Sequence, residues 1–294
     1  MATAEILAEV TRLAAGLKEE IKRGIGDNGV IDVAFMGGLS PIYPFRPALN
    51  LDLDFCVVAQ RRDAVLGAWL LDLRSWCLRE WRIGQLTCDV RVVRGPIKDV
   101  PSTLDRAHLT LHPAVFVEDE YRRMSPLLRW SWRKYACEVD PDRLHRLAPS
   151  QRPGLPELLS SRGGVQRTIE HLEEGIADMR EWVLPGFEES PQRVTKADPL
   201  WVEYCLSKVA VIARGHARCL GLAEPDFLAN EPFADWYYEN VFRSEEFRQL
   251  MKTKENVRRS GYGVSPPDVH GLTLTYLRRV ANLCGEAASS IAAP

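Results

Sequence analysis

Apolar side chains recur at steps of three and four along residues 4–24, which is the spacing of an amphipathic helix. The positions are Ile6, Val10, Leu13, Leu17 and Ile21. An apolar run at residues 30–36 comes next and predicts a short buried strand that ends at the pair Gly37-Gly38. The chain is therefore expected to begin as a helix followed by a strand.

Residues 51–58 alternate between polar and apolar side chains, and this pattern predicts a second strand. Because strand side chains point alternately to the two faces of a sheet, Asp52 and Asp54 share one face, and the apolar residues between them share the other. Two adjacent carboxylates repel each other, and a divalent cation removes that cost. Mg²⁺ prefers such oxygen ligands, so this strand is a candidate magnesium site.

The next patterns complete a small mixed core of helices and strands. Residues 63–79 predict a helix with Asp63 as its N-cap. Residues 85–93 predict a strand in which Asp89 lies between apolar neighbours. Residues 109–117 fit either one more strand or a connection to the next domain, and the pattern does not choose between them.

From about residue 125 the chain follows helical periods, with loops expected at 149–156 and 185–198. Helices are predicted at 125–138, 165–183, 199–220, 233–255 and 268–290. The fold class is therefore expected to be α+β, with a mixed-sheet core over residues 1–122 and a helical bundle over residues 123–294.

The Gly37-Gly38 pair adds a second kind of chemistry to the aspartates. Glycines after a strand let backbone N–H groups approach a phosphate closely, because no Cβ stands in the way. A glycine turn that binds a triphosphate, beside two aspartates that hold metal, is the arrangement that nucleotidyl transfer needs.

This order of motifs resembles that of the DNA polymerase β-like nucleotidyltransferase superfamily. Its members have an apolar-Gly-Gly/Ser turn, a loop and an Asp-apolar-Asp-apolar strand. Here Met36-Gly37-Gly38 is followed by 13 residues and then by Asp52-Leu53-Asp54-Phe55. The superfamily also carries a third carboxylate on a later strand, and Asp89 matches it. The resemblance covers residues 30–93, with Gly38 where many members have serine.

The resemblance implies a role for each of these residues. Asp52, Asp54 and Asp89 would hold two Mg²⁺ ions, and Asp89 would be a metal ligand, the general base that deprotonates the attacking hydroxyl, or both. The candidate contacts to the nucleotide are Gly37, Gly38, Ser40, Arg46 and Lys208. ATP is the default donor by frequency in the family, but the sequence does not select the base.

The layout of a core followed by a helical bundle is similar to that of the antibiotic nucleotidyltransferases, above all the aminoglycoside adenylyltransferases. It implies antibiotic resistance, by transfer of a nucleoside monophosphate to a hydroxyl of a small molecule. Two alternatives stay open: a toxin or anti-phage enzyme that modifies tRNA, protein or nucleotides, and a degenerate member that binds a nucleotide or a partner without turnover. As in the family, the protein would be a monomer or a homodimer.

The composition limits the partners and the cellular compartment that are expected for this protein. The formal net charge is −2, so no global basic field attracts nucleic acid, although a local basic patch is compatible with it. There is no run of 18 apolar residues and no apolar segment of the signal-peptide kind, so no membrane association is expected. The seven cysteines are scattered without C-x-x-C pairs, as in a cytoplasmic protein with reduced thiols. The six histidines show no metal-ligand spacing.

Overall fold

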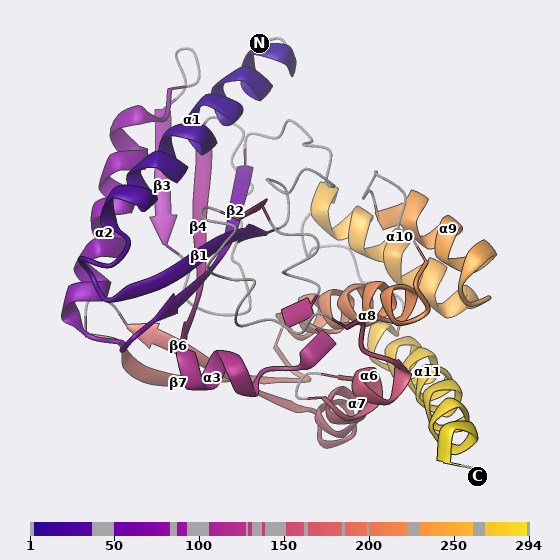
Figure 1. The fold of residues 1–294 in the computed structure, drawn as a ribbon. Helices are drawn as coiled ribbons and strands as arrows, with labels where there is room; N and C mark the ends of the chain where they lie inside the picture. The colour runs from indigo at the N-terminus through magenta and orange to yellow at the C-terminus, as the bar shows by residue number, and fades with distance from the viewer. Residues whose placement is uncertain are drawn as a thin grey trace. The chain divides into compact units, whose positions relative to one another are not determined.

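The computed structural model has an α+β architecture and forms two compact units (Figure 1). It describes residues 3–36, 50–82, 87–92, 106–127, 129–130, 137–138, 151–161, 164–183, 186–198, 200–222, 230–260 and 268–292. The first unit comprises residues 1–123, 132–148 and 180–191, and the second comprises 124–131, 149–179 and 192–294.

The first unit is built on a five-stranded sheet of order β3-β4-β2-β1-β5. The strands are β1 (Val30–Met36), β2 (Asn50–Ala59), β3 (Thr87–Val92), β4 (Arg106–Val117) and β5 (Cys137–Glu138). β1 is antiparallel to both β2 and β5, whereas β4 is parallel to both β2 and β3, so the sheet is mixed. The segment at 109–117 is thus a strand of the sheet rather than a connection.

Two helices, α1 (Thr3–Gly24) and α2 (Ala64–Glu80), lie side by side along one face of this sheet (Figure 1). The predicted stripe of α1 is confirmed where it is described, because Leu13, Leu17 and Ile21 are buried in the core. The predicted N-cap is confirmed as well: Asp63 accepts a hydrogen bond from the Leu66 backbone N–H at 3.0 Å. A short helix, α3 (Glu118–Arg123), follows β4.

The alternation along β2 decides which face of the sheet these helices cover. Leu53, Phe55 and Val57 belong to one apolar cluster with residues of α1 and α2. Leu109 and Leu111 of β4 belong to the same cluster. Because successive strand residues point to opposite faces, the even-numbered positions of both strands lie on the face away from α1 and α2.

A proline inside β4 is tolerated because of where the strand order places it. Pro113 pairs with Phe55 of β2, but the ladder with β3 ends at the pair of Val92 and Leu111. Beyond Leu111, β4 therefore pairs on one side only with the strands that the structure describes. A residue that lacks an N–H group fits such an edge position.

The prediction of one helix over 165–183 and a loop over 185–198 is wrong. The helix α7 (Val165–Glu174) stops at Gly175, which has a left-handed φ of 69° and whose N–H bonds to the Leu172 carbonyl at 3.1 Å. β6 (Ile176–Val183) and β7 (Glu188–Thr195) then form a two-stranded sheet. Glycine favours this left-handed position after a helix, so the helix ends there although the apolar spacing continues.

The second unit consists mainly of helices. They include α6 (Leu155–Ser160), α7, α8 (Leu200–Cys219), α9 (Asn230–Asn240), α10 (Glu245–Ser260) and α11 (Val269–Ala292). α11 packs against α6, α7, α8 and α10, and so it is central to the unit. Every helix in the described part of the chain is too short or too polar to form a membrane span.

The predicted helix at 233–255 is two helices, α9 and α10. The N–H groups of Val241 and Phe242 both bond to the Tyr237 carbonyl at 2.9 Å, which closes α9. Ser244 then caps α10, because its hydroxyl accepts a hydrogen bond from the Phe247 N–H at 3.2 Å. A serine followed by two glutamates is a helix-start signal that the apolar period had hidden.

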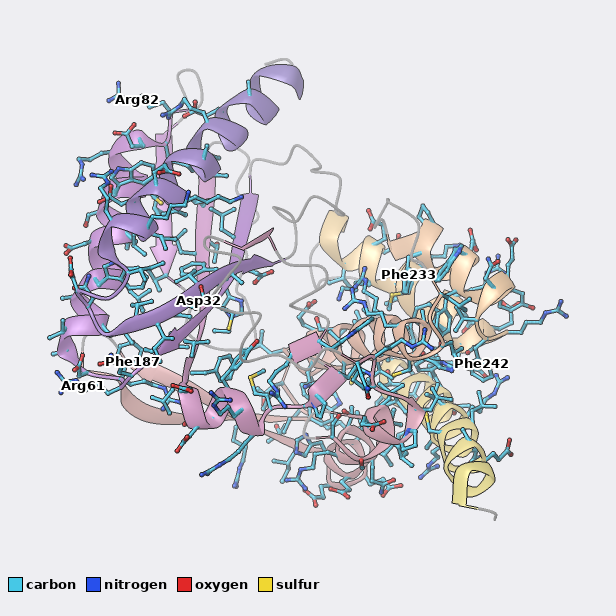
Figure 2. All side chains as sticks on the ribbon, in the orientation of Figure 1. Asp32, Arg61, Arg82, Phe187, Phe233 and Phe242 are labelled. Atoms are coloured by element: carbon cyan, nitrogen blue, oxygen red, sulfur yellow. The ribbon has the colours of Figure 1, made fainter. Side chains whose placement is uncertain are left out.

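A buried polar network joins three helices of the second unit. His216 of α8 lies 2.7 Å from the Tyr237 hydroxyl of α9, which lies 3.0 Å from the Tyr276 hydroxyl of α11. The ring of Phe242, labelled in Figure 2 together with Phe233, lies 6.2 Å from the His216 ring. Burial lowers the pKa of His216 to about 4, so the imidazole is neutral inside the bundle.

Candidate functional site

The face of the sheet away from α1 and α2 carries the residues expected to do chemistry. In the parallel pairing of β2 with β4, Asp52 lies beside Thr110, and Asp54 lies beside His112. Paired positions on neighbouring strands share a face and lie roughly 4.8 Å apart. The sheet therefore sets two polar residues of β4 directly against the two aspartates of β2.

Asp54 and His112 form a direct side-chain contact. The distance from Asp54 Oδ1 to His112 Nδ1 is 2.8 Å. The Asp54 side chain is 29% exposed and that of His112 is 18% exposed, so the pair is open to a ligand from solvent. When His112 carries its ring proton on Nδ1, it donates that proton to the carboxylate.

The other aspartate of β2 is placed by its backbone. Asp52 lies two residues before Asp54 on the same strand, so the two share a face and their Cα atoms are about 6.7 Å apart. Its side chain lies outside the described part of the chain, whereas its neighbour Thr110 is buried. The predicted arrangement of Asp52 and Asp54 on one face, with Leu53 on the other, agrees with this register.

Asp89 occupies a different place in the sheet. It lies on β3, where it pairs with His108 of β4, and β4 stands between β3 and β2. Two strand spacings, about 9.5 Å, therefore separate the line of Asp89 from that of Asp52. The sheet brings Asp52 and Asp54 together on one strand. It sets Asp89 on the same face, two strands away from them.

A further carboxylate on this face is closed to ligands. Asp32 of β1, labelled in Figure 2, is completely buried. It pairs with Val58, four pairs along the β1–β2 ladder from the pair of Met36 and Asp54. Its Oδ1 accepts a hydrogen bond from the Val33 backbone N–H at 2.7 Å. Burial, and to a smaller extent the charge of Asp32, raise the pKa of the Cys56 thiol well above its usual value.

The described part of β1 ends beside Asp54. Met36, its last residue, pairs with Asp54, and Gly37 and Gly38 follow it in the sequence. Gly37, Gly38, Ser40 and Arg46 themselves lie outside the described residues. Their predicted contacts with phosphate stay predictions.

Lys208 belongs to the second unit. Its ammonium lies 5.6 Å from the centre of the Tyr204 ring, and burial lowers its pKa. The Tyr204 hydroxyl in turn contacts His171 Nδ1 at 2.9 Å. The structure thus places Lys208 against an aromatic side chain of its own helix, and its predicted contact with a triphosphate stays a prediction.

The donor set on β2 suits magnesium. Mg²⁺ is usually held by one or two carboxylates and by substrate phosphates, and an Asp-x-Asp strand supplies two carboxylates on one face. His112 contacts Oδ1 of Asp54, and a carboxylate that accepts a hydrogen bond keeps further lone pairs for a cation. Within the side chains that the structure describes, no three His, Cys, Asp or Glu residues lie together as a metal site. The fit therefore rests on Asp52 and Asp54.

The histidine contact was missed by sequence reasoning. His112 is 58 residues from Asp54 along the chain, so no local spacing connects them. One signal was available: in L-T-L-H, the leucines at 109 and 111 and the polar residues at 110 and 112 alternate as they do around Asp54. Read as a strand, that alternation places Thr110 and His112 on a polar face.

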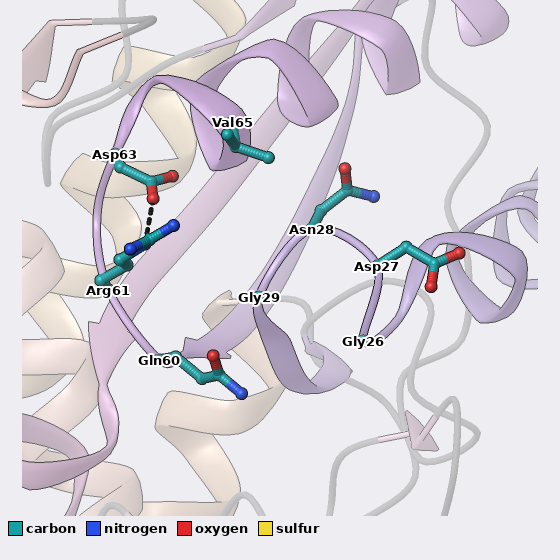
Figure 3. Close-up of a pocket in the computed structure, with 8 residues that line it drawn as sticks. All are labelled: Gly26, Asp27, Asn28, Gly29, Gln60, Arg61, Asp63 and Val65. Atoms are coloured by element: carbon teal, nitrogen blue, oxygen red, sulfur yellow. Dashed lines mark ion pairs between the residues drawn. The ribbon is translucent and has the colours of Figure 1, made fainter.

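A small pocket of about 200 Å³ lies at the other end of β2 (Figure 3). It is formed by the turn at 26–29 and by residues 60–65 at the start of α2. Arg61 forms an ion pair with Asp63 there, and the Asp63 carboxylate already caps α2. The cation and the helix end that would attract an anion are therefore occupied by the protein itself.

No protein-family model matches this sequence, and no curated protein matches it either.

Proposed function

We propose that the chain is a Mg²⁺-dependent nucleotidyltransferase that moves a nucleoside monophosphate, with ATP as the first donor to test, onto a hydroxyl of a small molecule. The observation that supports this most is the pairing of Met36 with Asp54. Met36 directly precedes Gly37 in the sequence, and its place beside Asp54 supports the proposal that the phosphate-binding and metal-binding parts are neighbours.

The residues would divide the reaction between them. Asp52 and Asp54 would hold Mg²⁺, which when bound supplies positive charge against the triphosphate. Backbone N–H groups at Gly37 and Gly38 would bind the phosphates and orient them. The acceptor hydroxyl oxygen attacks the α-phosphorus in line, the bond to the bridging oxygen breaks, and pyrophosphate leaves. Asp89, on the same face, is the candidate to receive the hydroxyl proton.

The acceptor class is the one implied by the resemblance to the antibiotic nucleotidyltransferases. An aminoglycoside-like antibiotic is therefore the first acceptor to screen. Such a reaction would belong in the cytoplasm, where nucleoside triphosphates are supplied. Five cysteines of the described chain, Cys56, Cys77, Cys205, Cys219 and Cys284, are buried free thiols, which suits that setting.

The test is nucleotide binding, measured by calorimetry with a non-hydrolysable ATP analogue in the presence and absence of Mg²⁺. We expect Mg²⁺-dependent binding by the wild type and a loss of about 100-fold or more in affinity for Asp54→Asn, which removes a ligand charge but keeps the shape. Asp72→Asn is the matched control, since it makes the same change on the exposed side of α2 and should bind as the wild type does.

Two results would contradict the proposal. If Asp54→Asn binds as tightly as the wild type, Asp54 holds no metal. If the wild type binds none of the ATP, GTP, CTP and UTP analogues, the chain is no nucleotidyltransferase, and the degenerate alternative, a partner-binding protein, takes its place.

A further inference from the structure

β4, the strand beside Asp54, carries a histidine that is not part of the nucleotidyltransferase motif. β4 lies against β2 along its whole length, and its His112 contacts Asp54 at 2.8 Å. Asp89 lies on β3, and β4 separates β3 from β2. A residue of β4 is therefore better placed than one of β3 to act on Asp54.

The backbone of His112 is held in place by its strand. The neighbours of His112, Leu111 and Pro113, are buried, and the parallel register fixes position 112 beside position 54. The bond at Oδ1 ties the Asp54 carboxylate to this fixed position, and it therefore restricts the rotation of the Asp54 side chain.

We propose that His112 is a positioning residue for the metal ligand Asp54. By holding Oδ1, His112 fixes the orientation in which the Asp54 carboxylate would meet the ion, and β4 thereby supplies a third residue of the site. This inference rests on the proposed function, because it requires Asp54 to bind metal. Groups that orient a metal ligand commonly change metal affinity 10- to 100-fold when they are removed.

A purely structural bond between the same two side chains makes a different prediction. Removing it would lower the stability of the metal-free protein but leave the affinity for metal unchanged. The experiment therefore has to measure metal affinity directly and to record the melting temperature of the metal-free protein beside it.

The experiment compares three substitutions of His112 by titration with Mn²⁺ in the presence of a non-hydrolysable ATP analogue, with unbound Mn²⁺ followed by electron paramagnetic resonance. His112→Ala removes the donor. His112→Asn keeps an N–H donor at the same number of bonds from Cβ as Nδ1. His112→Gln keeps polar bulk but carries its amide one bond farther out, and so it replaces the alanine variant if that one does not fold.

We expect the alanine and glutamine variants to bind Mn²⁺ 10- to 100-fold more weakly than the wild type, and the asparagine variant to stay within about threefold of it. Affinity equal to that of the wild type in the alanine or glutamine variant overturns the inference, and so does an equal loss in all three variants. If the wild type binds no Mn²⁺, or binds it no more tightly than Asp54→Asn does, the proposed function itself fails, and the inference fails with it.

Discussion

Two histidines, one in each unit, make short hydrogen bonds with very different consequences. His112 contacts a carboxylate at 2.8 Å, and both side chains are partly open to solvent. His216 contacts the Tyr237 hydroxyl at 2.7 Å, and both residues are buried. The first pair can still bind a ligand, whereas the second has its partners inside the bundle.

The difference lies in the charge of the partner and in the access of water. A carboxylate keeps lone pairs for a cation even while one oxygen accepts a hydrogen bond. In the buried network, the Tyr237 hydroxyl bridges His216 and Tyr276, so the three side chains use one another as partners. We therefore propose a binding role for the His112 pair and a stabilising role for the His216 network.

The largest effect that tests this comparison is expected at Asp52. Asp52→Asn should weaken Mg²⁺-dependent binding of the ATP analogue about 100-fold, because it removes a carboxylate from the Asp54 strand. Asp89→Asn should cost less than about tenfold, because β4 separates that residue from the pair. Calorimetry on both variants checks this. Equal losses would show that Asp89 reaches the ion across β4.

Acid should destabilise the protein through His216. The unfolded chain takes up a proton below about pH 6.5, whereas the folded chain, with a pKa of about 4 at His216, does not. The free energy of unfolding should therefore fall by up to about 3 kcal/mol from this group as the pH falls from 6.5 to 4. Urea unfolding at a series of pH values measures it.

The control for the acid prediction is His216→Gln, which has no charge to gain. Its free energy of unfolding should change less between pH 6.5 and 4 than that of the wild type. An unchanged slope in this variant would show that other groups cause the acid sensitivity. His270, whose pKa is also lowered by burial, acts in the same direction and is present in both proteins.

A smaller effect is expected for Tyr237→Phe. The change removes the hydroxyl that bridges His216 and Tyr276, and it should cost about 1–3 kcal/mol of the free energy of unfolding. The neighbouring Tyr238→Phe, at a half-buried position, is the control and should change that free energy by less than about 0.5 kcal/mol. Equal values for the two variants would mean that the network adds no stability.

Much of the first unit could be predicted from sequence because its patterns are local. Period-four spacing predicted α1, alternation predicted β2, and an aspartate before an apolar stripe predicted the cap of α2. The stretch at 165–183 failed because its apolar spacing continues past Gly175, where the backbone turns left-handed and the helix stops. At that point the conformation of one glycine outweighs a periodic pattern.

The candidate site, too, was predictable from the sequence only in part. The sequence by itself determined that Asp52 and Asp54 share a face, because strand alternation depends only on the backbone. Only the tertiary structure decided that β4 enters the sheet between β2 and β3. That choice brings His112 to Asp54 and sets Asp89 two strands away from it, because strand order is set by packing between segments far apart in the chain.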